Sequence, residues 1–202
     1  SDAGEPRHAP LRNVGEAIDF TTENSTRDVV GHSSFMSGVV AGASTSECPG
    51  LAPDAELLIA RVFSATQQST TAWFLEAFNY ALHRRYAMLC YAMLCYAMLG
   101  MLCYALHRRV DLINLAVGGP DFRDAPFAGK VRQLADEGIV IASGAGNSGP
   151  GWGSLLNPAD ELVVVGVGGM DATGRLAAWS SRGMTQWESP HGAGRVGVDV
   201  VG

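Results

Sequence analysis

The amino-acid sequence predicts an α/β fold in which a mostly parallel sheet is covered by helices on both faces. Short, near-continuous apolar runs alternate with segments that suit helices along most of the chain. Such runs are typical of strands buried on both faces, as in parallel sheets covered by helices. The 202 residues, of which 47% are hydrophobic, contain enough apolar material for one sizeable core. We therefore expect one domain, or most of one, over residues 1–202.

The predicted elements are strands separated by helices. The earliest helical pattern is the run of small and apolar residues from Gly31 to Gly42, which contains a histidine at its start. Helices are also predicted at 71–85 and 127–137, the latter closed by Gly138. The apolar runs predict strands at 56–63, 110–117, 139–143 and 162–167. In parallel sheets of this kind the chemistry gathers at the carboxyl ends of the strands.

Residues 86–109 form a low-complexity apolar insert in otherwise ordinary sequence. A pentad repeats from Tyr86 to Leu106, and the hexamer Tyr-Ala-Leu-His-Arg-Arg occurs twice, at 80–85 and 104–109. Three interpretations are open, namely a membrane-spanning helix, an expansion that lengthens a surface helix, and an error in the predicted gene. The flanking helix and strand must return to one core, so we expect the insert to loop out of a domain that does not need it.

Composition excludes several classes of function. The net charge of -6 and the lack of a long basic run argue against a nucleic-acid partner. The first residues contain no basic start followed by an apolar core, so we identify no secretory signal in this chain. Three of the four cysteines lie inside the insert, so the sequence indicates neither a disulfide framework nor a cysteine-based metal site.

Three residues have side chains suited to hydrolytic chemistry. His32 lies at the start of the first helical run, where an imidazole is well placed to act as a base. Asp2, upstream of it, offers a carboxylate that can orient this imidazole. Asn147 lies in a glycine-rich loop, where its carboxamide can donate to a developing oxyanion. Taken singly, each has a plainer explanation: a packed or solvated histidine, a surface aspartate at a frayed end, and a turn-forming asparagine.

Together with three further motifs, these residues resemble the subtilisin-like serine protease family in order and spacing. The motifs are Gly50 to Leu57, Asn114 to Pro120 and Ala177 to Gly183. Longer stretches such as ECPGLAPDAELLIARVF, DLINLAVGGPDF and SSRGMTQWESP are similar to the site-one protease branch of that family. The likeness covers nearly the whole chain outside residues 86–109.

The resemblance implies a subtilisin-like three-layer fold and a serine endopeptidase activity. His32 matches the family's catalytic histidine, Asp2 its catalytic aspartate if one residue is deleted after it, and Asn147 its oxyanion-hole asparagine. The segments Leu115 to Gly119 and Ser143 to Gly146 would line the cleft in which subtilases receive an extended peptide. Because the site-one branch acts in the secretory pathway, in the Golgi or endoplasmic reticulum, the implied substrates are membrane-tethered precursor proteins.

Three departures from the family pattern bear on activity. Ser33 and Ser34 follow the histidine where Gly-Thr is usual, which predicts crowding beside the base. Ala116 stands where a serine is usual, which removes a hydroxyl near the cleft. The Gly-Thr-Ser segment with the nucleophile is expected beyond Gly202, so we assign no serine that role and expect this chain alone to be inactive. The alternative is a catalytically inactive, subtilase-like binding or scaffold domain.

The loops indicate no cofactor. Gly144, Gly146 and Gly149 spell the dinucleotide-binding pattern G-x-G-x-x-G, but Pro150 to Gly153 continue the loop where that site requires a helix. Calcium is implied only by the resemblance, since no acidic loop here has the alternating ligand spacing of a calcium site. Membrane association is implied only for parts of the full-length protein outside this chain.

Overall fold

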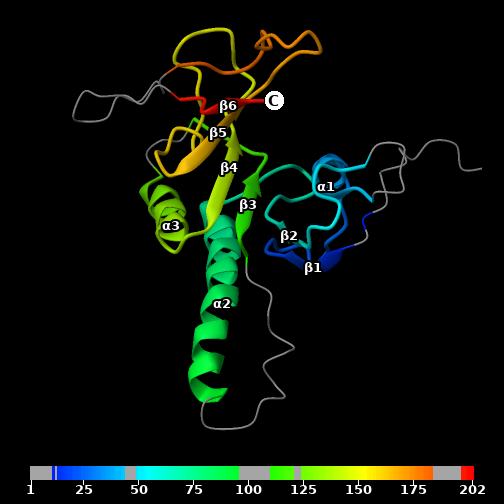
Figure 1. Cartoon of the computed structure of the whole chain (residues 1–202), viewed down its shortest axis with the longest axis vertical. Helices are drawn as coiled ribbons and strands as arrows, with labels where there is room; N and C mark the ends of the chain where they lie inside the picture. The colour runs from blue at the N-terminus through cyan, green and yellow to red at the C-terminus, as the bar shows by residue number, and fades with distance from the viewer. Residues whose placement is uncertain (1–10, 12, 44–48, 96–109, 121–123, 184–196) are drawn as a thin grey trace, which may run out of the picture. The chain divides into compact units, whose positions relative to one another are not determined.

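The computed structural model describes two parallel sheets with their helices (Figure 1), over residues 11, 13–43, 49–95, 110–120, 124–183 and 197–202. The chain divides into two compact units, Ser1–Ala77 and Phe78–Gly202, and each contains one sheet. Every pair of neighbouring strands runs parallel. Parallel neighbours need crossover connections, and an α-helix occupies the first crossover of each sheet. The predicted α/β class with parallel pairing is therefore confirmed.

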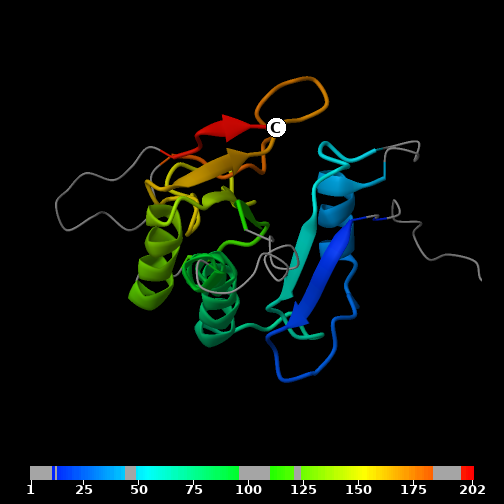
Figure 2. The ribbon, with the colours of Figure 1, turned by 60° about the horizontal axis from the view of Figure 1, so that its bottom comes forward.

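The first unit is built on a βαβ crossover. β1 (Val14–Asp19) and β2 (Leu57–Arg61) pair from Val14 opposite Leu57 to Asp19 opposite Arg61. Figure 2 shows them as neighbouring arrows. The connection between them contains α1 (His32–Ala41). β2 lies inside the predicted strand 56–63, and α1 inside the predicted helical run, whereas β1 has no counterpart among the predicted elements.

The helix α2 (Thr71–Cys95) starts where the sequence predicts it and continues into the insert. The repeat is rich in alanine, methionine and leucine, which favour helices, so the backbone remains helical beyond Arg85, the predicted end. In the described part of the chain no helix combines the length and hydropathy needed to cross a bilayer. Residues 96–109 lie outside the described residues, so the looping out of the insert stays a prediction.

The second unit is built on a four-stranded parallel sheet. Its strands lie in the order β3 (Leu112–Leu115), β4 (Val140–Gly144), β5 (Val164–Gly168) and β6 (Val200–Val201). The helix α3 (Ala125–Asp136) joins β3 to β4, and the Asp124 carboxylate caps it by accepting from the Phe127 N–H at 3.1 Å. β3, β4, β5 and α3 confirm the predicted strands and helix, with ends shifted by one or two residues.

One face of this sheet carries the core of the second unit. Ile141 and Val164 on neighbouring strands are buried, as is Leu134 on α3. The ring of Phe78 on α2 lies 5.7 Å from the ring of Phe127 on α3, so the two helices share this core. Burial of apolar side chains between the helices and the sheet is the main stabilising term in such a layer.

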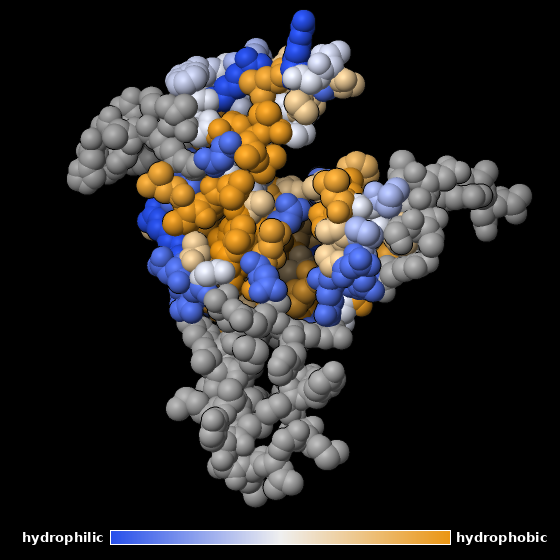
Figure 3. All heavy atoms as spheres, viewed as in Figure 1, coloured by the Kyte–Doolittle hydropathy of each residue, from blue (hydrophilic) through white to orange (hydrophobic). Residues whose placement is uncertain are grey.

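The opposite face of the same sheet is apolar and open to solvent. Leu112, Val140 and Val165 alternate with the buried residues and are 57%, 51% and 37% exposed. Figure 3 shows hydrophobic side chains gathered at the surface of this unit. A parallel sheet with an apolar second face needs a second covering layer. The predicted cover of helices on both faces is consistent with this surface and stays a prediction.

Candidate active site

The helix α1 places a histidine at its first position. Gly31 precedes it with φ 82°, in the left-handed region that favours glycine, and the Phe35 N–H donates to the Gly31 carbonyl at 2.9 Å. His32 is exposed. The residue predicted to be the base therefore stands at a helix start with its imidazole accessible.

The first turn of α1 is capped from outside by the carboxylate of Asp28. Its Oδ1 accepts from the Val30 and Gly31 N–H groups at 3.2 and 2.8 Å. Its Oδ2 accepts from the backbone N–H and the hydroxyl of Ser34 at 2.6 and 2.7 Å. Burial alone would raise the pKa of Asp28, but these four hydrogen bonds hold it below its ordinary value. Sequence reasoning missed Asp28, because it lies three residues before the N-cap Gly31 and the usual capping signal is at the N-cap itself.

The serine pair after the histidine has a structural role. Ser34 supplies a hydroxyl that donates to Asp28, and a threonine at this position would supply the same group. Ser33 is exposed. The departure from Gly-Thr therefore keeps the hydrogen bond between two side chains in this turn, from the hydroxyl at position 34 to Asp28.

The loop between β1 and α1 is fastened by two further carboxylates. Asp19 accepts from the Thr21 N–H and hydroxyl at 2.9 and 2.7 Å, and from the Ser25 N–H at 2.8 Å. Glu23 forms an ion pair with Arg61 of β2. Asp2, the predicted orienting carboxylate, lies outside the described residues, so its role stays a prediction.

Asn147 lies in the loop after β4, and this loop is anchored at both ends. The Ala145 N–H donates to the Val167 carbonyl at 2.7 Å. The Gly149 N–H donates to the Trp179 carbonyl at 2.9 Å. The carboxyl ends of parallel strands lie at one edge of a sheet, so this loop stands where ligands bind in α/β proteins.

Both neighbours of Asn147 are bound to one buried serine. The Ser181 N–H donates to the Gly146 carbonyl at 3.0 Å, and the Ser181 Oγ accepts from the Ser148 N–H at 3.0 Å. Asn147 itself is exposed, and its carboxamide has no hydrogen-bond partner among the residues that the structure describes. The side chain is therefore not used to bond its own backbone, as it is in an asparagine turn.

The two segments predicted to line the substrate cleft are joined to each other and to a third segment. Leu115 of β3 pairs with Ser143 of β4, and the Ser143 hydroxyl donates to the Val117 carbonyl at 3.4 Å. Gly119 and Asn157 exchange two backbone hydrogen bonds, both of 3.0 Å. The second unit thus brings together all the predicted cleft segments.

Leu156 occupies the space between these segments. A Cβ on Gly118 would lie 3.1 Å from the Cβ of Leu156, and a Cβ on Gly146 would lie 2.7 Å from its Cγ and Cδ1. The Leu156 N–H donates to the Ala145 carbonyl at 3.0 Å, which fixes the residue beside β4. Sequence reasoning missed Leu156, since its position depends on contacts with two distant segments.

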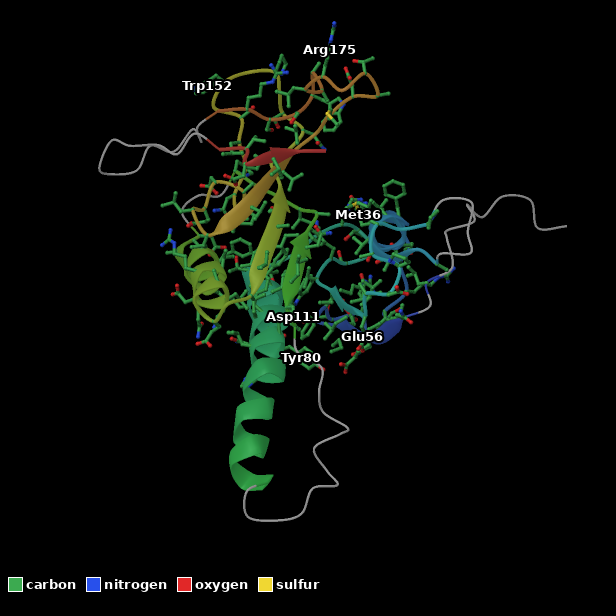
Figure 4. All side chains as sticks on the ribbon, viewed as in Figure 1. Met36, Glu56, Tyr80, Asp111, Trp152 and Arg175 are labelled. Atoms are coloured by element: carbon green, nitrogen blue, oxygen red, sulfur yellow. The ribbon has the colours of Figure 1, made fainter. Side chains whose placement is uncertain are left out.

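The described residues do not build a metal or dinucleotide site. No group of three or more His, Cys, Asp or Glu side chains among them is arranged to hold a metal ion. The described backbone between β4 and β5 contains no helix, so the glycines of the G-x-G-x-x-G pattern do not open a helix that would bind a pyrophosphate. Figure 4 shows Trp152 and Arg175 on the loops that follow β4 and β5.

His32 belongs to the first unit and Asn147 to the second. Because the two side chains belong to different units, the expectation that they face one cleft stays a prediction. Within its own unit, each residue lies on a segment that side-chain hydrogen bonds hold in place.

Comparison with known proteins supplies the family. Residues 6–201 match the subtilase family. The chain is 44% identical over 195 residues to the membrane-bound transcription factor site-1 protease of Rattus norvegicus. The aligned residues make up 96% of this chain and 16% of that protein. The chain is 41% identical over 194 residues to subtilisin-like protease SBT6.1 of Arabidopsis thaliana, with the same two coverages of 96% and 16%.

A solved structure supports the fold. The S41 psychrophilic protease aligns with a TM-score of 0.60 at 23% sequence identity, over 81% of this chain and 48% of that one. The subtilisin-like fold expected from the sequence is therefore confirmed. Because the family match extends over nearly all of its residues, the chain belongs to the subtilase family.

Proposed function

We propose that this chain is part of the catalytic domain of a serine endopeptidase that hydrolyses peptide bonds by acyl transfer. The observation that carries the proposal is the exposed carboxamide of Asn147, on an anchored loop at the carboxyl end of a parallel sheet. A donor held in this way is suited to stabilise a developing oxyanion without reorganising. Membership of the subtilase family supports the reaction class.

In the proposed reaction the nucleophile is a serine outside these 202 residues. Its Oγ bonds to the carbonyl carbon of the substrate while His32 takes the hydroxyl proton. The oxyanion accepts from the Nδ2–H of Asn147. The C–N bond then breaks, and His32 gives its proton to the leaving amine. Water then attacks the carbonyl carbon of the acyl-enzyme while His32 takes a proton from it. The ester C–O bond breaks, His32 returns the proton to the serine Oγ, and the acid leaves. Asp2 orients the imidazole throughout.

The proposed substrate is an extended protein segment that lies beside Leu115–Gly119 and Ser143–Gly146. We propose that this segment belongs to membrane-tethered precursor proteins of the secretory pathway, because the rat relative is named for a membrane-bound transcription factor. Some subtilases bind calcium, so calcium is a possible ligand of the full-length protein by family resemblance.

The test is covalent labelling of the full-length protein with a fluorophosphonate, which phosphonylates activated serines, together with hydrolysis of a peptide library. We expect one serine outside residues 1–202 to be labelled and hydrolysis to fall in proportion. Residues 1–202 alone should show neither. If the folded full-length protein were neither labelled nor active, the proposal would fail and an inactive binding or scaffold domain would be favoured.

Replacement of Leu156 by alanine should change which side chains are accepted beside the scissile bond. Leu156 fills the space between Gly118 and Gly146. Gly146 directly precedes Asn147, the proposed oxyanion donor. The shorter side chain should raise kcat/KM for substrates with bulkier residues, relative to substrates with smaller ones, by about 10-fold. This is the lower end of the discrimination that one methylene group gives in an apolar pocket. Peptide sets that differ only at that residue measure the ratio. Leu162→Ala is the matched control, because Leu162 is 82% exposed.

A further inference from the structure

The carboxylate of Asp28 binds the backbone on both sides of His32. One oxygen accepts from the N–H of Gly31, directly before the histidine, at 2.8 Å. The other accepts from the N–H of Ser34, two residues after it, at 2.6 Å, and from the Ser34 hydroxyl at 2.7 Å. A single side chain therefore fixes the peptide groups that flank the histidine.

This turn depends on Asp28 because α1 has no other side-chain cap. Gly31, at the N-cap position, has no side chain, and the first turn contains no acidic residue. The carboxylate supplies both the missing acceptors and a negative charge near the positive end of the helix dipole. With the backbone held on both sides, the remaining freedom of the imidazole is rotation about its own side-chain bonds.

We propose that Asp28 is a positioning residue for His32, acting through the backbone at Gly31 and through Ser34 and without touching the substrate. The inference rests on the proposed function, since His32 is the general base only in that reaction. It also accounts for the serine at position 34, because the hydrogen bond to Asp28 requires a hydroxyl and not the methyl group of a threonine.

The test compares Asp28→Ala with a matched loss of hydrogen bonds elsewhere in the full-length protein. The Asp171 carboxylate accepts from the N–H and hydroxyl of Thr173 and from the N–H of Arg175, in a turn after β5. Asp171→Ala therefore removes bonds of the same kind in the second unit, whereas α1 belongs to the first. Displacement of a catalytic group by about 1 Å costs on the order of 100-fold in rate. We expect Asp28→Ala to lower kcat by about 10- to 100-fold with little change in KM, and Asp171→Ala to leave kcat unchanged.

Two further variants separate positioning from general stability. Ser34→Ala keeps the carboxylate and removes one of its bonds, so kcat should fall by about 3- to 10-fold, and Ser34→Thr should retain the wild-type value. These variants also decide the matter if Asp28→Ala does not fold. An equal fall of kcat in Asp28→Ala and Asp171→Ala, or an unchanged kcat in both Asp28→Ala and Ser34→Ala, would overturn the inference.

Hydrogen exchange measured by mass spectrometry gives a readout that needs no activity. In Asp28→Ala, amides 30–34 should exchange at least about 10-fold faster, whereas in Asp171→Ala they should exchange as in the wild type. Absence of peptidase activity in the wild-type protein would refute the proposed function. The exchange data would still show whether Asp28 fixes the backbone around His32. Unchanged exchange of amides 30–34 in Asp28→Ala would refute the inference in either case.

Discussion

His32→Ala should lower kcat for peptide hydrolysis by the full-length protein by about 10⁴-fold or more, the scale seen when the base of a serine protease is removed. Without the imidazole no group at the start of α1 can take the serine proton or return it to the leaving amine. His32 is exposed and His83 on α2 is also exposed, so His83→Ala is a matched control that should keep the wild-type kcat.

The measurement is initial-rate hydrolysis of a fluorogenic peptide, with circular dichroism to show that each variant is folded. Stability should change little, because the side chain of His32 is open to solvent. Retention of more than about a tenth of the wild-type kcat in His32→Ala would exclude this histidine as the base.

Asn147→Ala should lower kcat by about 10²- to 10³-fold and leave KM nearly unchanged, the range known for an oxyanion-hole asparagine in a subtilisin. The reason for this pattern is that its carboxamide meets an oxyanion that exists only in the transition state and the tetrahedral intermediate. Ser148→Ala is a suitable control. Its backbone N–H still reaches Ser181, so the loop keeps its anchor and kcat should be unaffected.

Steady-state kinetics on the same peptide separate kcat from KM for both variants. A rise of KM at constant kcat in Asn147→Ala would mean that the side chain binds the ground state of the substrate and not the oxyanion. Equal losses in Asn147→Ala and Ser148→Ala would point to a disturbed loop.

Most of the fold was predictable because its buried strands are short apolar runs. The segment that becomes β4 carries the apolar run Ile139 to Ala142 after Gly138, and this pattern indicates a strand without any tertiary information. β1 could not be found in this way. It contains Gly15 and two carboxylates, so its extended form is determined by pairing with β2. β6 is short and is defined by its pairing with β5.

The candidate site was predictable only in part. His32 and Asn147 stand in motifs whose order and spacing are recognisable in the sequence, and the structure places them at a helix start and after a strand end. The roles of Leu156 and Ser181 could not be predicted, although Ser181 lies in a recognised motif, since each role depends on contacts made only in the folded chain. Asp28 acts locally, but it lies three residues before the N-cap Gly31, where the usual capping pattern does not place the acceptor.

The capping of α1 also fixes how the start of this helix responds to acid. The hydrogen bonds to Asp28 hold its pKa below the ordinary value of 3.8, so its stabilising contribution is complete above that value. The contribution declines only as the pH falls through the lower folded-state pKa. A mildly acidic pH lies well above this window. Acidification of that degree therefore leaves Asp28 ionised and the backbone around His32 fixed.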